Sequence, residues 1–304
     1  MIQYSFLFLS LFVASICAAP PEYLSSRESV QHPLVDQLVT IEPECNAAEQ
    51  KSIRRALSDA YEIAEVAQHI QKTDPAFSNY FVKGDKKFVP AMFESFLSGG
   101  GSHKKFPITC VHASSPENHK FCLGGNLAFV ETDKDGVEKI FLCPQFFGNP
   151  APPPGYGTTA LTLSSKKLTA QGWCTPPPHI LGHYTSLGAH TILHEMTHIT
   201  FIATHALNPP RLPHGFRLVV DLMGQPDELH PGHFYNDWPP ASARELKHRW
   251  DDYQAAQAKE DFSYKMPPVP TSRNAENYAD SGVEYYFEKK CSNFKPADIL
   301  VKAN

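Results

Sequence analysis

Several features that would place this 304-residue chain in a common class are missing from its sequence. It has no Cys-x-x-Cys pair, which argues against a zinc–thiolate site, and no Asn-x-Ser/Thr sequon, so N-glycosylation is not expected. It has 27 Lys and Arg against 32 Asp and Glu, and this balance gives no reason to expect nucleic acid or a membrane as a partner. We find no internal repeats, and no apolar run after residue 17 is long enough to span a bilayer.

The chain begins with a short apolar run, Ile2 to Cys17, which ends in Ala18-Ala19-Pro20. This pattern predicts a secretory signal peptide over residues 1–18, with cleavage after Ala18 or Ala19, and therefore a secreted, extracellular protein. Six cysteines then remain in an oxidising compartment, which favours three disulfides among fifteen possible pairings. These cysteines are Cys45, Cys110, Cys122, Cys143, Cys174 and Cys291.

The first half of the mature chain reads as helices followed by a small sheet. Residues 19–44 are polar, and we interpret them as a pro-segment or an ordered arm. Asn46 and Glu49 form a capping-box pattern ahead of apolar residues at helical spacing, which predicts a helix that stops before Asp74-Pro75. A second helix is expected over 90–97, ended by three glycines. Short strands are then expected over 108–112, 126–131 and 139–142.

Asp133-Lys134-Asp135-Gly136 lies between the last two strands and is a turn signal, so we expect a mostly antiparallel sheet with a hairpin. Further helices are predicted over 187–206 (with Ser186 as the cap and Asn208-Pro209-Pro210 as the end), 241–260 and 274–290. Residues 209–240 are rich in Pro and His and read as a long, functional insertion. The fold class is therefore α+β, with one domain over 45–292 and a tail over 293–304.

The most informative motif is His194-Glu195-Met196-Thr197-His198, which reads H-E-x-x-H within the third predicted helix. Residues four apart on a helix point the same way, so His194 and His198 can bind one metal ion. Glu195 then stands where a carboxylate takes a proton from the attacking water. The pattern predicts one catalytic Zn²⁺. The alternative is that the motif binds no metal and is only two histidines and an acid on a partly solvent-exposed helix face.

The third ligand does not follow from this motif. The longer pattern H-E-x-x-H-x-x-G-x-x-H fails, because Phe201 and Thr204 stand at its glycine and third histidine. Later acids are alternatives, either Glu276 or Asp280 in one predicted helix, or the Asp251-Asp252 pair in another. Glu276 also suits a solvated helix start, and the Asp251-Asp252 pair suits a solvated helix face. His190, one turn before His194, reads as a buried supporting histidine or as an auxiliary metal ligand.

In the order of its fragments the chain resembles the fungal deuterolysin and peptidyl-lysine metalloendopeptidase group, the aspzincins. The resemblance is carried by the helix after Cys45, by Ile140 to Phe147, by Thr191 to His198 and by Asn274 to Ala279, and it covers most of the mature chain. It implies a zincin-like fold and pairs Cys45 with Cys110, Cys122 with Cys143, and Cys174 with Cys291.

The resemblance also implies an Asp ligand within a G-T-x-D-x-x-Y-G pattern. By order along the chain this ligand falls on Asp252, with Asp251 and Glu276 as alternatives. The glycines, the threonine and the tyrosine of the pattern are not kept, and Ala255 stands at the tyrosine position. Tyr253, His233 or Tyr235 would then have to stabilise the oxyanion.

Three functions compete on these observations. The leading one is a secreted zinc metalloendopeptidase, a monomer acting on proteins or peptides, with His194, His198 and Asp252 as ligands and Glu195 as general base. The second is a non-catalytic zinc-binding protein on the same scaffold, resembling the secreted zinc-scavenging relatives of the family. The third is a secreted interaction protein that binds its partner through the 209–240 insertion.

Overall fold

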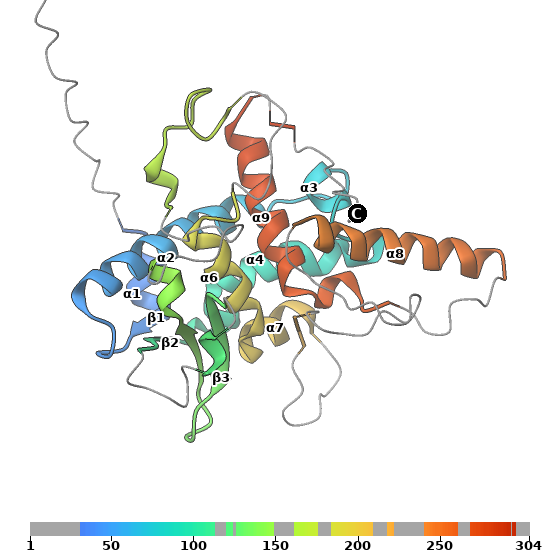
Figure 1. Cartoon of the computed structure of the whole chain (residues 1–304). Coiled ribbons are helices and arrows are strands. Elements are labelled where there is room, and N and C mark those ends of the chain that lie inside the picture. The colour runs from blue at the N-terminus through green and yellow to red at the C-terminus, as the bar shows by residue number, and fades with distance from the viewer. Residues whose placement is uncertain are drawn as a thin grey trace, which may run out of the picture.

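The computed structural model describes nine stretches of the chain: residues 31–112, 120–123, 126–148, 161–175, 184–208, 218–221, 240–260, 268–292 and 294–295. The predicted signal peptide and most of the 209–240 insertion lie outside them. Within the described residues the fold is α+β, as expected, with a small sheet at one edge of a group of packed helices (Figure 1). None of the described helices combines the length and apolar character needed to cross a membrane.

The N-terminal part is helical, and its main helix begins at the predicted cap. Helix α2 (Ala47–Ala67) starts after Asn46, whose side chain accepts hydrogen bonds from the N–H groups of Ala48 and Glu49. The Glu49 carboxylate accepts from the Asn46 N–H at 2.8 Å, which completes the capping box. The end of the preceding 19–44 segment is ordered, with helix α1 (Leu34–Leu38) and strand β1 (Val39–Ile41).

The sheet differs from the predicted one in its pairing. Its order is β1-β2-β4-β3, with β2 over Phe106–Cys110, β3 over Ala128–Thr132 and β4 over Glu138–Leu142. Only β3 and β4 are antiparallel, as the hairpin at 133–136 required, whereas β1 pairs with β2 and β2 with β4 in parallel. The prediction of a mostly antiparallel sheet was wrong because a parallel crossover leaves no turn signal at the strand ends.

Helix α4 (Phe88–Ser98) follows a single-turn helix α3 (Pro75–Ser78), and Gly99 ends α4 in the left-handed conformation, as the glycine run predicted. The predicted helix over 187–206 is two helices, α6 (Gly188–His198) and α7 (Thr200–Leu207), because Ile199 between them is extended. Leu187 rather than Ser186 occupies the N-cap of α6. Shorter turns of helix occur at Lys83–Lys87, Gly99–His103, Pro144–Phe147, Leu163–Ser165 and Thr271–Arg273.

Helix α9 (Ala275–Lys290) runs through the centre of the molecule and packs against both α2 and α6, with α8 (Pro240–Ala258) on its other side (Figure 1). Residues 275 to 287 of α9 are all buried, which makes this helix the core of the fold. Gly282 allows the close packing, since a Cβ there would lie 2.8 Å from the Phe93 ring of α4. Helix α6 therefore packs against a buried helix.

Three disulfides join the pairs that the family resemblance implied: Cys45–Cys110, Cys122–Cys143 and Cys174–Cys291. The first connects the start of α2 to the end of β2, and the last connects the end of α9 to the segment ahead of α6. Such bridges are compatible with an oxidising, extracellular compartment. They also hold α2, the sheet and α9, which together surround α6.

Candidate metal centre

Helix α6 brings His194 and His198 together, as their spacing predicted. Their Nε2 atoms are 3.3 Å apart, with the two rings nearly perpendicular at 71°. His198 is almost completely buried, and 17% of the His194 side chain is exposed. Glu195 lies between them in the helix and is buried.

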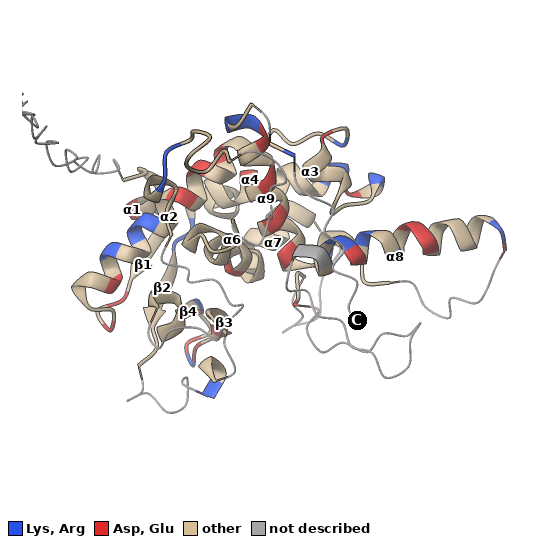
Figure 2. Cartoon of the chain, turned by 45° about the horizontal axis from the view of Figure 1, so that its top comes forward, with Lys and Arg blue, Asp and Glu red and all other residues tan. Residues whose placement is uncertain are grey.

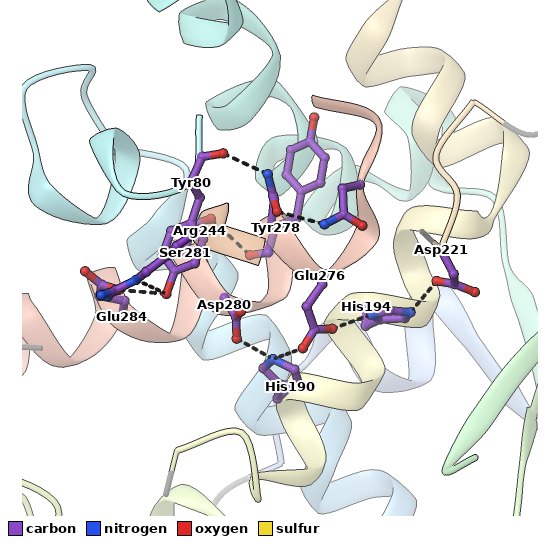
Figure 3. Close-up of polar contacts among 12 residues, drawn as sticks. Tyr80, His190, His194, Asp221, Arg244, Glu276, Tyr278, Asp280, Ser281 and Glu284 are labelled. Carbon is purple, nitrogen blue, oxygen red and sulfur yellow. Dashed lines mark hydrogen bonds and ion pairs between the residues drawn. The ribbon is translucent and has the colours of Figure 1, made fainter. Parts of the chain in front are cut away.

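The third group beside these rings is Asp221, which the sequence analysis did not consider. Its Oδ1 lies 2.9 Å from the Nε2 of His194 (Figure 3). The same oxygen lies 2.9 Å from the Nε2 of His198. The three ligand atoms lie within 4.8 Å of one another and can hold a metal ion. The Asp221 side chain is half-exposed, so the centre is open to solvent on that side.

A short stretch of backbone places Asp221. Residues 218–221 form a strand-like segment attached to the start of α9, where the Val220 N–H donates to Arg273 O and the Ala275 N–H donates to Val220 O. The Arg273 Nε also donates to Leu218 O at 2.9 Å. This segment is therefore held between α9 and α6, with Asp221 aimed at the histidine pair.

Two of the carboxylates predicted as the third ligand, Asp252 and Asp251, lie away from the histidine pair. Asp252 is exposed on α8, a helix that projects from α9 away from α6, and it belongs to no metal-binding group in the described structure (Figure 1). Asp251, one residue before, pairs with Lys247 on the same helix. The expectation of Asp252 rested on the order of fragments along the chain, and the fold directs α8 away from the histidines.

Glu276 supports the centre from behind instead of binding as the third ligand. Its Oε2 accepts a hydrogen bond from the Nδ1 of His194 at 2.8 Å. On the other ring, the Nδ1 of His198 donates to the Val219 carbonyl at 3.1 Å. Both Nδ1 atoms must donate, because their partners only accept, so the Nε2 of each neutral ring carries the free lone pair that a metal ion needs. A carboxylate or carbonyl behind a ligating imidazole is the usual support of a metal site.

The charges around the centre favour a cation. Burial lowers the pKa of His194, but Asp221 and Glu276 outweigh this effect and raise it well above its usual range. Desolvation raises the pKa of Asp221, and the two imidazoles reverse this and hold it well below its usual range. Two Nε2 atoms that face one carboxylate oxygen need positive charge between them, either as protons or as a metal ion.

The separation of the two nitrogens suits a tetrahedral ion. Bonds of about 2.0–2.1 Å to a tetrahedral Zn²⁺ would separate two ligand nitrogens by about 3.3–3.4 Å. The observed 3.3 Å between the Nε2 atoms agrees with this separation. Two imidazoles and one carboxylate leave one position of such an ion open, as in catalytic sites.

The sequence did carry a signal for Asp221. Leu218-Val219-Val220 is a short apolar run with two β-branched residues inside the proline-rich stretch, and Asp221 follows it directly. Because residues 209–240 were interpreted as one surface insertion, the short segment that ends in Asp221 was not predicted. The other expected residues of the site, His233 and Tyr235, lie outside the described residues, whereas Tyr253 is on α8 with Asp252.

Comparison with protein-family models, with curated proteins and with solved structures gave no match.

Proposed function

We propose that this protein is a secreted zinc-dependent endopeptidase, with His194, His198 and Asp221 as the ligands. The observation that carries the proposal is the convergence of two imidazole nitrogens and one carboxylate oxygen within hydrogen-bonding distance of one another. The aspzincin resemblance supports it, since that family also combines H-E-x-x-H with a downstream aspartate. Asp221 takes the role that the resemblance had suggested for Asp252.

When bound, zinc would polarise the scissile carbonyl and make the attacking water more acidic. Glu195 follows His194 directly in α6 and is the general base of this proposal, because it can take the proton of that water and return it to the leaving amine. Glu276 and Val219 hold the two imidazoles in the orientation that presents their Nε2 atoms. The open side next to Asp221 is where a substrate carbonyl would enter.

One observation favours a second candidate function, in which the protein captures zinc and hydrolyses nothing. In the family pattern a tyrosine follows the ligand aspartate by three residues and assists the transition state. Counted from Asp221, that position is Gly224, and Leu218 and Val219 replace the glycine and threonine of the pattern. Zinc binding would survive these changes, whereas stabilisation of the oxyanion would need another donor.

The substitution Glu195→Gln separates the two functions. In a peptidase it should lower hydrolysis of a protein substrate by about 10²- to 10⁴-fold, the usual contribution of a general base, with the zinc content unchanged. Zinc content and peptide release would be measured on the same preparations. Wild-type protein that holds zinc but cleaves no protein or peptide between acid and neutral pH would rule out the peptidase and favour capture.

A matched pair of aspartates tests the ligand assignment. Asp221→Asn should remove tight zinc binding at the histidine pair, because it replaces an anionic ligand by a neutral amide. Asp252→Asn is the control, since Asp252 is exposed on α8 and should leave both zinc binding and activity unchanged. If the two variants behaved in the opposite way, Asp252 would be the ligand after all.

A further inference from the structure

A second group of potential ligands lies directly behind the histidine pair. His190 is one turn before His194 on α6, and Glu276 and Asp280 are one turn apart on α9, which packs against it (Figure 3). All three are buried, with exposed fractions of 5%, 3% and 2%. No sequence motif joins them, because the two helices are about eighty residues apart in the chain (82 between His194 and Glu276).

Their ligand atoms converge. The Nε2 of His190 is 3.0 Å from Asp280 Oδ1 and 3.5 Å from Glu276 Oε1. One nitrogen and two carboxylate oxygens lie within 4.8 Å of one another, so the group has the dimensions of a metal site. It also has the donor types, imidazole and carboxylate, that zinc accepts.

Two oxygens of this group are buried without a hydrogen bond. Among the described residues, Glu276 Oε1 and Asp280 Oδ2 have no hydrogen-bond partner, although the other oxygen of each carboxylate has one. Buried carboxylate oxygens are nearly always satisfied, and an unsatisfied one calls for an ion or another missing partner. Both carboxylates come from the group that converges on His190 (Figure 3).

The charge of the group also calls for a divalent cation. When both carboxylates are ionised, they carry two negative charges, and a protonated His190 would balance one of them. A divalent ion bound to neutral His190 balances both and occupies the space between the three ligand atoms. The deep burial of the group makes this balance important, because an uncompensated charge is costly away from water.

We propose that His190, Glu276 and Asp280 form a second zinc site, with Glu276 bridging it to the first. Glu276 Oε1 binds in the second site, while Oε2 holds the Nδ1 of His194 at 2.8 Å. The two sites are thus coupled through one carboxylate. This proposal does not require peptide hydrolysis, and it stands or falls separately from the function assigned to the first site.

The test is a count of tightly bound zinc on the purified full-length chain. Metal-free protein would be titrated with Zn²⁺ against a competing chelator strong enough to mask weak surface histidines. We expect two equivalents for the wild type, one for Asp280→Asn, one for Asp221→Asn and none for the double variant. Asp252→Asn, an exposed aspartate on α8, is the matched control and should keep two.

One result would overturn the second site: an Asp280→Asn variant that binds as many equivalents of zinc as the wild type. The Asp221→Asn variant tests only the first site: loss of one equivalent of zinc supports that site, and an unchanged count contradicts it. Circular dichroism checks that each variant is folded. Should Asp280→Asn fail to fold, His190→Gln decides the question, because glutamine can keep a hydrogen bond to Asp280 but removes the imidazole ligand.

Discussion

The two ends of the acidic face of α9 show two ways of keeping carboxylates buried. Four acids follow one another at intervals of four residues and so share one face of this helix: Glu276, Asp280, Glu284 and Glu288. Figure 2 shows acidic residues along α9. Towards the C-terminal end, Glu284 is completely buried and accepts hydrogen bonds from Arg244 at 2.7 Å, from the Tyr80 hydroxyl at 2.9 Å and from Asn79 at 2.6 Å.

At the N-terminal end the carboxylates of Glu276 and Asp280 contact imidazoles, whose charge depends on protonation. Burial raises the pKa of Asp280 to about 7, with Glu276 adding to the effect. Burial also raises the pKa of Glu276, but His190 and His194 outweigh this and lower it. Arginine carries a permanent charge, so Arg244 compensates Glu284 at every pH. Histidine can lose its proton, and a neutral imidazole can bind a metal ion in its place.

The largest effect is expected where the permanent cation is removed. Arg244→Met should lower the free energy of unfolding by about 3–5 kcal/mol, because it leaves Glu284 buried without its charge partner. Urea unfolding followed by circular dichroism, with zinc present, would measure this loss. Adding Glu284→Gln should restore much of it. A loss well under 1 kcal/mol for Arg244→Met would mean that the pair does not compensate charge in this way.

A smaller effect is expected where the carboxylate only supports a ligand. Glu276→Gln should weaken zinc binding at the first site by about 10- to 100-fold, since glutamine accepts the His194 hydrogen bond but does not make the imidazole more basic. The measurement is best made in an Asp280→Asn background, where only the first site is expected to bind. Unchanged affinity in that background would leave Glu276 without a role at the first site.

The smallest effect belongs to Glu288, at the solvent end of the same face. Burial, together with the charges of Glu284 and Asp74, raises its pKa to about 7. The unfolded value is about 4.3, so the contribution of Glu288 to stability is complete below about pH 4.3 and is lost as the pH rises through 7. Because Glu288 is only partly buried, solvent screening reduces this to about 1–2 kcal/mol.

Glu288→Gln should therefore reduce the fall in unfolding free energy between pH 5 and pH 8. Thermal or urea unfolding at several pH values would measure the change in slope. Asp252→Asn, which removes an exposed carboxylate, is the control. If Glu288→Gln and the control gave the same pH dependence, the burial of Glu288 would not be what shifts its titration.

Local patterns predicted most helices of this fold. The capping box at Asn46, the glycines after α4 and the helical spacing within α8 and α9 act over a few residues. Helices α4, α8 and α9 lie within two residues of their expected bounds, whereas α2 begins as expected but ends at Ala67, well before Asp74-Pro75. The main failures involved distant partners. Strand β1 has three residues and pairs in parallel with β2, with Val39 opposite Phe106, so no local pattern in the sequence predicts it.

By itself the sequence determined that two imidazoles would meet on one face of α6, because the 3.6-residue period of the helix brings His194 and His198 together. Only the tertiary structure decided what joins them. Asp221 reaches the pair because backbone hydrogen bonds attach its segment to α9, and Glu276 lies behind His194 because α9 packs against α6. Such contacts depend on how whole helices pack, which the spacing of residues within one helix does not encode.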